Sequence, residues 1–272
     1  MKKFTICFTA VAAALSICAC DKGYVKTAEE GEEIVFSIEN DIDLTVNTRA
    51  SAVTSLSTVY WEASCEGVVK HSVASYSVSG GVISTGKYWP LNGRYDYKVS
   101  NVAFFTGTGA IAASNDIDVL VGTAGGVTDN SCTVTLNHIF ARTASLTLNT
   151  QTGYELSDVS WKIRSKGVET GTAGIYTIGS GWSSAASTPL AEQEITGSSD
   201  LYLIPGTYTI TVSYTLSKGD YSEAIVRSAD VSLSEGCKNS ITATAVGGNA
   251  KELTFSVSVE PWVEKDVTVT LN

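Results

Sequence analysis

The side chains most often used for catalysis and metal binding are scarce in this 272-residue chain. His71 and His138 are the only histidines, and no Cys, Asp or Glu stands at metal-ligand spacing beside either. In the alternating run of residues 134–138, His138 shares a face with Val134 and Leu136, which favours a hydrogen-bonded structural histidine. No zinc-protease, serine-hydrolase or nucleotide-binding motif is present. The sequence therefore predicts a protein that is not an enzyme and that uses no cofactor or metal.

The remaining candidates for cation binding and for covalent cross-links are few. Two Asp-Ile-Asp triplets, at 41–43 and 116–118, could contact Ca²⁺, but both lack the glycine and the twelfth-position glutamate of an EF-hand loop. Beyond the N-terminal leader the cysteines are Cys65, Cys132 and Cys237, an odd number, so they cannot all pair within one chain. A Cys65–Cys132 bridge and three free thiols are equally compatible with the sequence.

Acylation is expected at one cysteine near the N-terminus. Lys2 and Lys3 are followed by an apolar segment that ends in Ile17-Cys18-Ala19-Cys20. This pattern indicates a secretory signal peptide over residues 1–19, too short to span a membrane as a stable helix. It resembles a bacterial lipobox, whose cysteine is acylated, and Cys20 fits that place because a small residue precedes it. We expect a precursor anchored by lipid at Cys20; the alternative is a plain signal peptide that ends near cysteines.

Proteolysis is expected after Arg49. The arginine stands in a small, polar, turn-prone setting, Thr48-Arg49-Ala50, where a trypsin-like protease could cut. The ribbon ahead of it alternates with period two, and the apolar positions of its buried face are Ile34, Phe36, Ile38, Ile42, Leu44 and Val46. Cleavage would remove the lipid, the acidic tether and this strand, all within residues 20–49, and would leave an open sheet edge that another chain's strand could fill. The alternative is an ordinary first strand followed by a solvated arginine.

The elements that must position these segments are β-strands. Only 17% of residues are charged, and Thr, Ser, Val and Tyr recur in short alternating runs, with no long run of helical periodicity. Residues 208–216 alternate most regularly and predict a central core strand. The predicted fold class is all-β, with two consecutive antiparallel β-sandwich domains at residues 50–140 and 141–272. No Pro/Gly linker separates them, so we expect the two domains to move as one body.

The net charge of the chain and the pattern of its C-terminal residues indicate which partners to expect. The formal net charge is −10, and a surface this acidic repels phosphate backbones, so nucleic acid is not an expected partner. At the C-terminus, Val267, Val269 and Leu271 form one apolar edge of an alternating ribbon. A terminal strand is the easiest element to lend to another chain, which makes this ribbon a candidate donor strand. The alternative is that it closes its own domain.

Taken together and in order, several short motifs resemble the fimbrillin family, the subunits and accessory proteins of type V pili in Gram-negative bacteria. The resemblance spans the mature chain nearly end to end. The motifs are the lipobox, Thr48-Arg49-Ala50, Tyr88-Trp89-Pro90, V-T-L-N-H-I-F-A-R at 134–142, I-P-G-T-Y-T-I-T-V at 204–212 and V-S-V-E-P-W at 257–262.

The resemblance implies two transthyretin-like β-sandwich domains, export as a lipoprotein to the outer membrane, cleavage by an arginine-specific protease, and joining of subunits by strand exchange. The cleavage site maps to Arg49-Ala50 and the removed strand to residues 34–46. Expected partners are other fimbrial subunits, that protease, the outer membrane through the lipid of the precursor, and a host protein or glycan. We predict a non-enzymatic structural subunit of a cell-surface fimbria that supports adhesion. The alternative is a surface-anchored lipoprotein that does not polymerise, either a fimbrial tip or anchor or a binder of glycan or host protein.

Overall fold

The computed structural model describes residues 33–40, 56–88, 93–128, 131–196, 201–246 and 252–261. Within these ranges all regular elements are β-strands, so the predicted all-β class is confirmed. No helix among them is long and apolar enough to span a membrane. The strands are β1 (Glu33–Asn40), β2 (Thr58–Cys65), β3 (Val68–Ser77), β4 (Val82–Tyr88), β5 (Tyr95–Ser100), β6 (Ala110–Ser114), β7 (Leu120–Val127), β8 (Ser131–His138), β9 (Ala141–Asn149), β10 (Glu155–Ser165), β11 (Ala173–Thr177), β12 (Gly181–Thr188), β13 (Gln193–Ile195), β14 (Tyr202–Leu203), β15 (Gly206–Lys218), β16 (Tyr221–Leu233), β17 (Cys237–Val246) and β18 (Glu252–Pro261).

The first half of the chain forms a seven-stranded sheet in the order β3-β2-β5-β7-β8-β1-β4. Buried side chains of β2 and β5, such as Trp61 and Tyr97, belong to the same core cluster as Ile83 of β4 and Val134 of β8. These strands are far apart in the sheet order, so the sheet must fold over on itself to bring them together. The result is a sandwich whose two layers are β3-β2-β5-β7 and β8-β1-β4.

The fold between the two layers lies where β7 meets β8. The two strands pair only at Leu120↔His138 and Val121↔Asn137. The next residue is Gly122, where a Cβ atom would lie 2.3 Å from the carbonyl oxygen of Thr135. Glycine is therefore needed here, because only a residue without a side chain lets β8 cross so close to β7.

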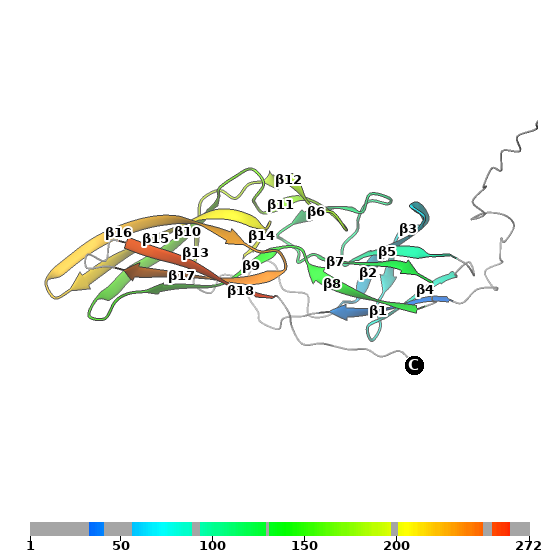
Figure 1. Cartoon of the computed structure of the whole chain (residues 1–272), viewed down its shortest axis with the longest axis horizontal. Helices are drawn as coiled ribbons and strands as arrows, with labels where there is room; N and C mark the ends of the chain where they lie inside the picture. Colours follow the sequence, from blue (N-terminus) through cyan, green and yellow to red (C-terminus); the bar gives the residue numbers. More distant parts are fainter. Residues whose placement is uncertain are drawn as a thin grey trace, which may run out of the picture.

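The second half forms a sandwich of two four-stranded sheets, β13-β10-β15-β16 and β14-β9-β17-β18. Its core contains the inward residues of β15, from Tyr208 to Leu216, packed with Ile241 and Ala243 of β17. The prediction of a core strand at residues 208–216 is confirmed. Figure 1 shows this sandwich at one end of the molecule and the strands of the first half at the other.

Among the described strands most pairs are antiparallel, but two are parallel. In the first sandwich β1 runs parallel to β8, and in the second β9 runs parallel to β17. The first strand of each half therefore takes an equivalent place, beside a strand near the end of the same half.

A smaller sheet and a third core cluster connect the two halves. β6 from the first half pairs with β11 from the second, and β12 completes this sheet, which lies between the sandwiches in Figure 1. Phe104, Ile111 and Phe140 share their cluster with Tyr176 and Ile204. The division at residue 141 and the rigid movement of the two halves stay predictions.

Candidate strand-exchange site

β1 is the central strand of the three-stranded layer β8-β1-β4. On one side Val35–Asn40 pair in parallel with Ser131–Leu136, and on the other β1 runs antiparallel to β4. Both neighbours come later in the sequence, so β1 is inserted between strands that the rest of the half supplies. Without it, the facing edges of β8 and β4 would carry unpaired backbone groups.

The register shows which positions of β1 share the core side of the layer. Phe36 is opposite both Ile83 of β4 and Cys132 of β8, and Ile38 is opposite Val134. Ile83 and Val134 are buried in the core of the first sandwich. Positions 36 and 38 therefore lie on the side of the sheet that faces this core.

The edge of β4 that faces β1 contains an irregularity. Glu33 is opposite Tyr88 and Val35 is opposite Ser84, so one residue of β1 faces the three residues 85–87. Gly86 has a φ of 59°, in the left-handed region, and the buried Thr85 closes the bulge because its Oγ1 accepts a hydrogen bond from the backbone N–H of Lys87 at 3.1 Å. Only part of β4 can thus form a regular ladder with β1.

Most of the predicted site residues fall outside the described residues. This applies to the lipidation site Cys20, the cleavage site Arg49-Ala50, the distal part of the removable strand (Ile42, Leu44 and Val46), and the candidate donor residues Val267, Val269 and Leu271. For Ile34, Phe36 and Ile38 the structure gives the backbone and its register alone. The roles assigned to all of these residues stay predictions.

Among the described residues, Cys65 and Cys132 are not joined in a disulfide. Cys65 is buried, and Cys132 and Cys237 are half-buried. Of the two arrangements that the sequence allowed, the Cys65–Cys132 bridge is therefore not the one in the structure. Burial raises the pKa of the Cys132 thiol to about 12, which keeps it protonated beside β1.

His138 is a structural histidine, as predicted. Its Nδ1 lies 2.9 Å from Oδ1 of Asp118, and both side chains are buried. Asp118 belongs to one of the two Asp-Ile-Asp triplets, but Asp116 of the same triplet instead accepts a hydrogen bond from Ser114 Oγ at 3.1 Å. The part of the chain that the structure describes contains no group of three or more His, Cys, Asp or Glu residues placed to hold a metal.

The carboxylate of Glu62, whose burial the sequence did not reveal, binds the loop at Gly107 that covers the first sandwich. Glu62 of β2 is 2% exposed, and its Oε2 accepts a hydrogen bond from the backbone N–H of Gly107 at 2.6 Å. Lys98 lies 3.7 Å from its Oε1 and donates to the carbonyl oxygen of Gly107 at 3.1 Å. The ion pair and the hydrogen bonds offset the cost of burying this charge. Its role is to fix the loop.

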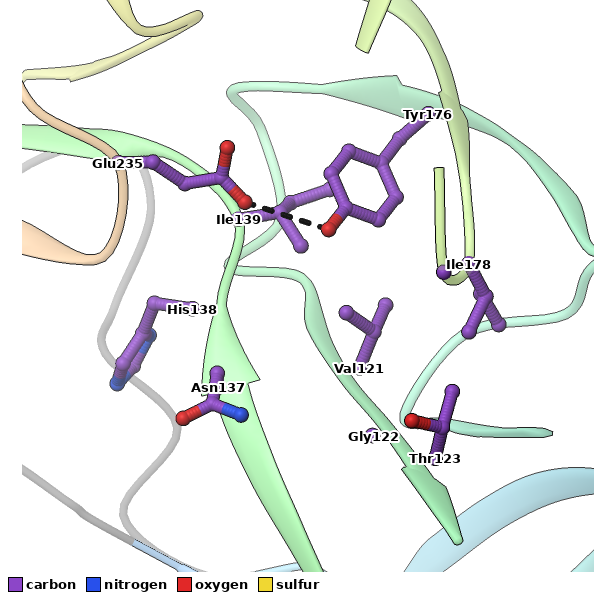
Figure 2. A pocket seen from close by; sticks show the side chains of 10 residues that line it. Val121, Gly122, Thr123, Asn137, His138, Ile139, Tyr176, Ile178 and Glu235 are labelled. Carbon is purple, nitrogen blue, oxygen red and sulfur yellow. Dashed lines mark hydrogen bonds between the residues drawn. The ribbon is translucent and has the colours of Figure 1, made fainter. Parts of the chain in front are cut away.

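A cavity of about 260 Å³ lies where β7 and β8 meet the β11 segment (Figure 2). Tyr176 Oη donates a hydrogen bond to Oε1 of Glu235 at 3.2 Å across its upper part. Burial raises the pKa of Glu235, and burial together with the Glu235 charge raises the pKa of Tyr176 to about 12. Figure 2 shows the side chain of His138 turned away from this pair. Both residues belong to the second half of the chain, and together they line the cavity beside β7 and β8 of the first half.

The comparisons with known proteins agree with this architecture. A family model described as fimbrillin-like matches residues 88–262. A solved structure of a candidate cell adhesion protein from Parabacteroides distasonis is similar with a TM-score of 0.60 and 11% identity, covering 88% of this chain and 99% of that one. A fimbrial protein from Bacteroides vulgatus is similar with a TM-score of 0.55 and 12% identity, covering 84% and 99%. At these identities the two structures support the fold. No curated protein matches the chain.

Proposed function

This chain belongs to the fimbrillin-like family, and from that premise we propose that it is a non-enzymatic structural subunit of a cell-surface fimbria, joined to its neighbours by strand exchange at the place of β1. It is a fimbrial protein, and its family implies a place in a cell-surface appendage. The partners are other fimbrial subunits of the same or a related kind, and the polymer supports adhesion to a host protein or glycan.

The observation that carries this proposal is the position of β1 in its sheet. β1 is the middle strand of a three-stranded layer, and both of its neighbours are distant in sequence. Its loss would open a slot between β8 and β4 above a core that includes Ile83 and Val134. A strand from another subunit would restore both backbone ladders and cover the apolar floor, which is the mode of recognition called β-strand addition.

The sequence places the steps of export and release in a workable order. Lipid at Cys20 would hold the precursor on the outer membrane, and residues 21–32 would connect it to β1. An arginine-specific protease would cut between Arg49 and Ala50 and release lipid, tether and β1 together. The mature subunit would contain a first domain at residues 50–140 and a second at 141–272, each with a core of its own. The incoming strand would be the C-terminal ribbon that contains Val267, Val269 and Leu271.

The proposal is tested by the intact mass of protein from the native cell surface. We expect a mature N-terminus at Ala50, without lipid, and accumulation of the lipid-bearing precursor in the Arg49→Ala variant. Arg49→Lys is the matched control: it should also block an arginine-specific protease, yet added trypsin should still cut it. Surface protein that keeps residues 20–49 intact would overturn strand exchange and would favour the surface-anchored lipoprotein that does not polymerise.

A further inference from the structure

We infer that the place of Phe36 is the anchor subsite of the slot, formed by Ile83 and Cys132, and that it fixes the register of the incoming strand with Val269 at that place. This inference rests on the proposed function, since it requires that β1 be replaced by another strand. It goes further because it assigns the residues that set how the strand lies.

The two walls of the slot overlap over a short length. On the β4 side the regular ladder runs from Val35↔Ser84 to Ser37↔Val82, and the bulge at 85–87 interrupts it before Glu33. On the β8 side the ladder runs from Val35↔Ser131 to Asn40↔Leu136. Positions 35–37 are therefore the only ones in the described part of β1 that pair regularly with both walls.

Of the positions of β1 that face the core, only that of Phe36 pairs regularly with both β4 and β8. Ile34 faces the bulge, and Ile38 is opposite Val134 on the β8 side alone. Phe36 is opposite Ile83, which is 0% exposed, and Cys132, which is half-buried. Both flanking side chains are apolar in character, so the subsite accepts an apolar side chain from the strand between them.

A subsite that distinguishes one position from the others is needed, because the alternation of apolar residues does not by itself fix the register of the incoming strand. A strand that slips by two residues still presents the same face to the core. The slot distinguishes such registers because its core-side positions differ. The place of Ile34 lies beside the buried Thr85. The place of Phe36 has a regular neighbour on each side, and the next core-side place after Ile38 is occupied in β1 by the polar Asn40.

These differences select one register for the C-terminal ribbon. In this inference it runs in the direction of β1, which is parallel to β8 and antiparallel to β4. With Val269 at the place of Phe36, Val267 takes the place of Ile34 and Leu271 that of Ile38. A slip by two in one direction would put Leu271 at the place of Asn40, and a slip in the other would put Val267 beyond Glu33, where β1 begins. In this direction one register alone fills the three apolar places with the three apolar residues.

The native Cys132 provides the test, because neighbouring strands lie about 4.8 Å apart and disulfides need Cα atoms about 4.4–6.8 Å apart. Full-length chains carrying Val267→Cys, Val269→Cys or Leu271→Cys are exported, cleaved after Arg49 and assembled in the presence of diamide. We expect disulfide-linked oligomers on non-reducing gels for Val269→Cys alone. Adding Cys132→Ser to that variant should abolish the cross-link and leave the polymers intact.

The possible outcomes separate this inference from the proposed function. Cross-links through Val267→Cys or Leu271→Cys would move the register by two and overturn the inference, while strand exchange would stand. Polymers without a cross-link from any of the three variants would also overturn it. If the cleaved wild-type chain forms no polymer, the proposed function itself fails. Phe36→Cys combined with Arg49→Ala tests the subsite within one chain, and we expect an internal disulfide with Cys132; without this disulfide the anchor assignment is wrong.

Discussion

Removal of β1 should destabilise the first sandwich by roughly its entire net stability. β1 forms six register pairs with β8 and four with β4. At about one hydrogen bond for each pair, and about 0.5–1.5 kcal/mol net for each bond, its loss removes on the order of 5–15 kcal/mol. The net stability of a whole domain is also about 5–15 kcal/mol. A chain that begins at Ala50 should therefore hold its first sandwich folded only when another strand fills the slot.

Hydrogen exchange followed by mass spectrometry measures this effect strand by strand. The chain that begins at Ala50 is compared with a chain from Asp21 that carries Arg49→Ala. We expect amides of β4 and β8 to lose protection in the shorter chain, while those of β15 and β17 keep theirs because they belong to the other core. A synthetic peptide of residues 263–272 should restore protection, and a scrambled peptide should not. Equal protection of β8 in both chains would refute the reasoning.

Four further substitutions test other parts of the structure. Glu62→Gln removes the ion pair that braces the loop and should lower the free energy of unfolding by about 1–3 kcal/mol in urea titrations; an unchanged midpoint would contradict this role. Gly122→Ala brings a methyl group against β8 and should lower the free energy of unfolding by about 1–3 kcal/mol or more. At Gly86 no atom lies within 4 Å of an added Cβ, so Gly86→Ala meets only the strain of its left-handed backbone, and its cost should be about 1–2 kcal/mol. Burial raises the pKa of Glu235 above its usual 4.5, so the stability this carboxyl contributes is present below that pH and lost as pH rises through the folded value. Glu235→Gln should remove that part of the decline in melting temperature as the pH rises above 4.5. A profile parallel to that of the wild type would exclude this role.

The sequence by itself determined the class of the protein and the inward faces of its strands. Alternation with period two is a property of consecutive residues, so it is readable without knowledge of the fold. The stretch from Tyr208 to Leu216 was predicted as a core strand for this reason, and each of its alternate residues is buried. The same pattern placed His138 among buried neighbours, and its hydrogen-bonded structural role is confirmed. The short motifs that resemble the fimbrillin family are likewise local, and the family is confirmed.

The tertiary structure alone decided which strands lie side by side. Nothing near Phe36 in the sequence indicates that Cys132 and Ile83 flank it, or that β1 runs parallel to β8. Glu62 alternates to the outer face of its strand, where a carboxylate is normally solvated, and it is buried only because the loop at Gly107 folds over it. Pairing and burial depend on segments that are distant along the chain. Many pairings satisfy the same alternation, and only the packing of the whole chain chooses among them.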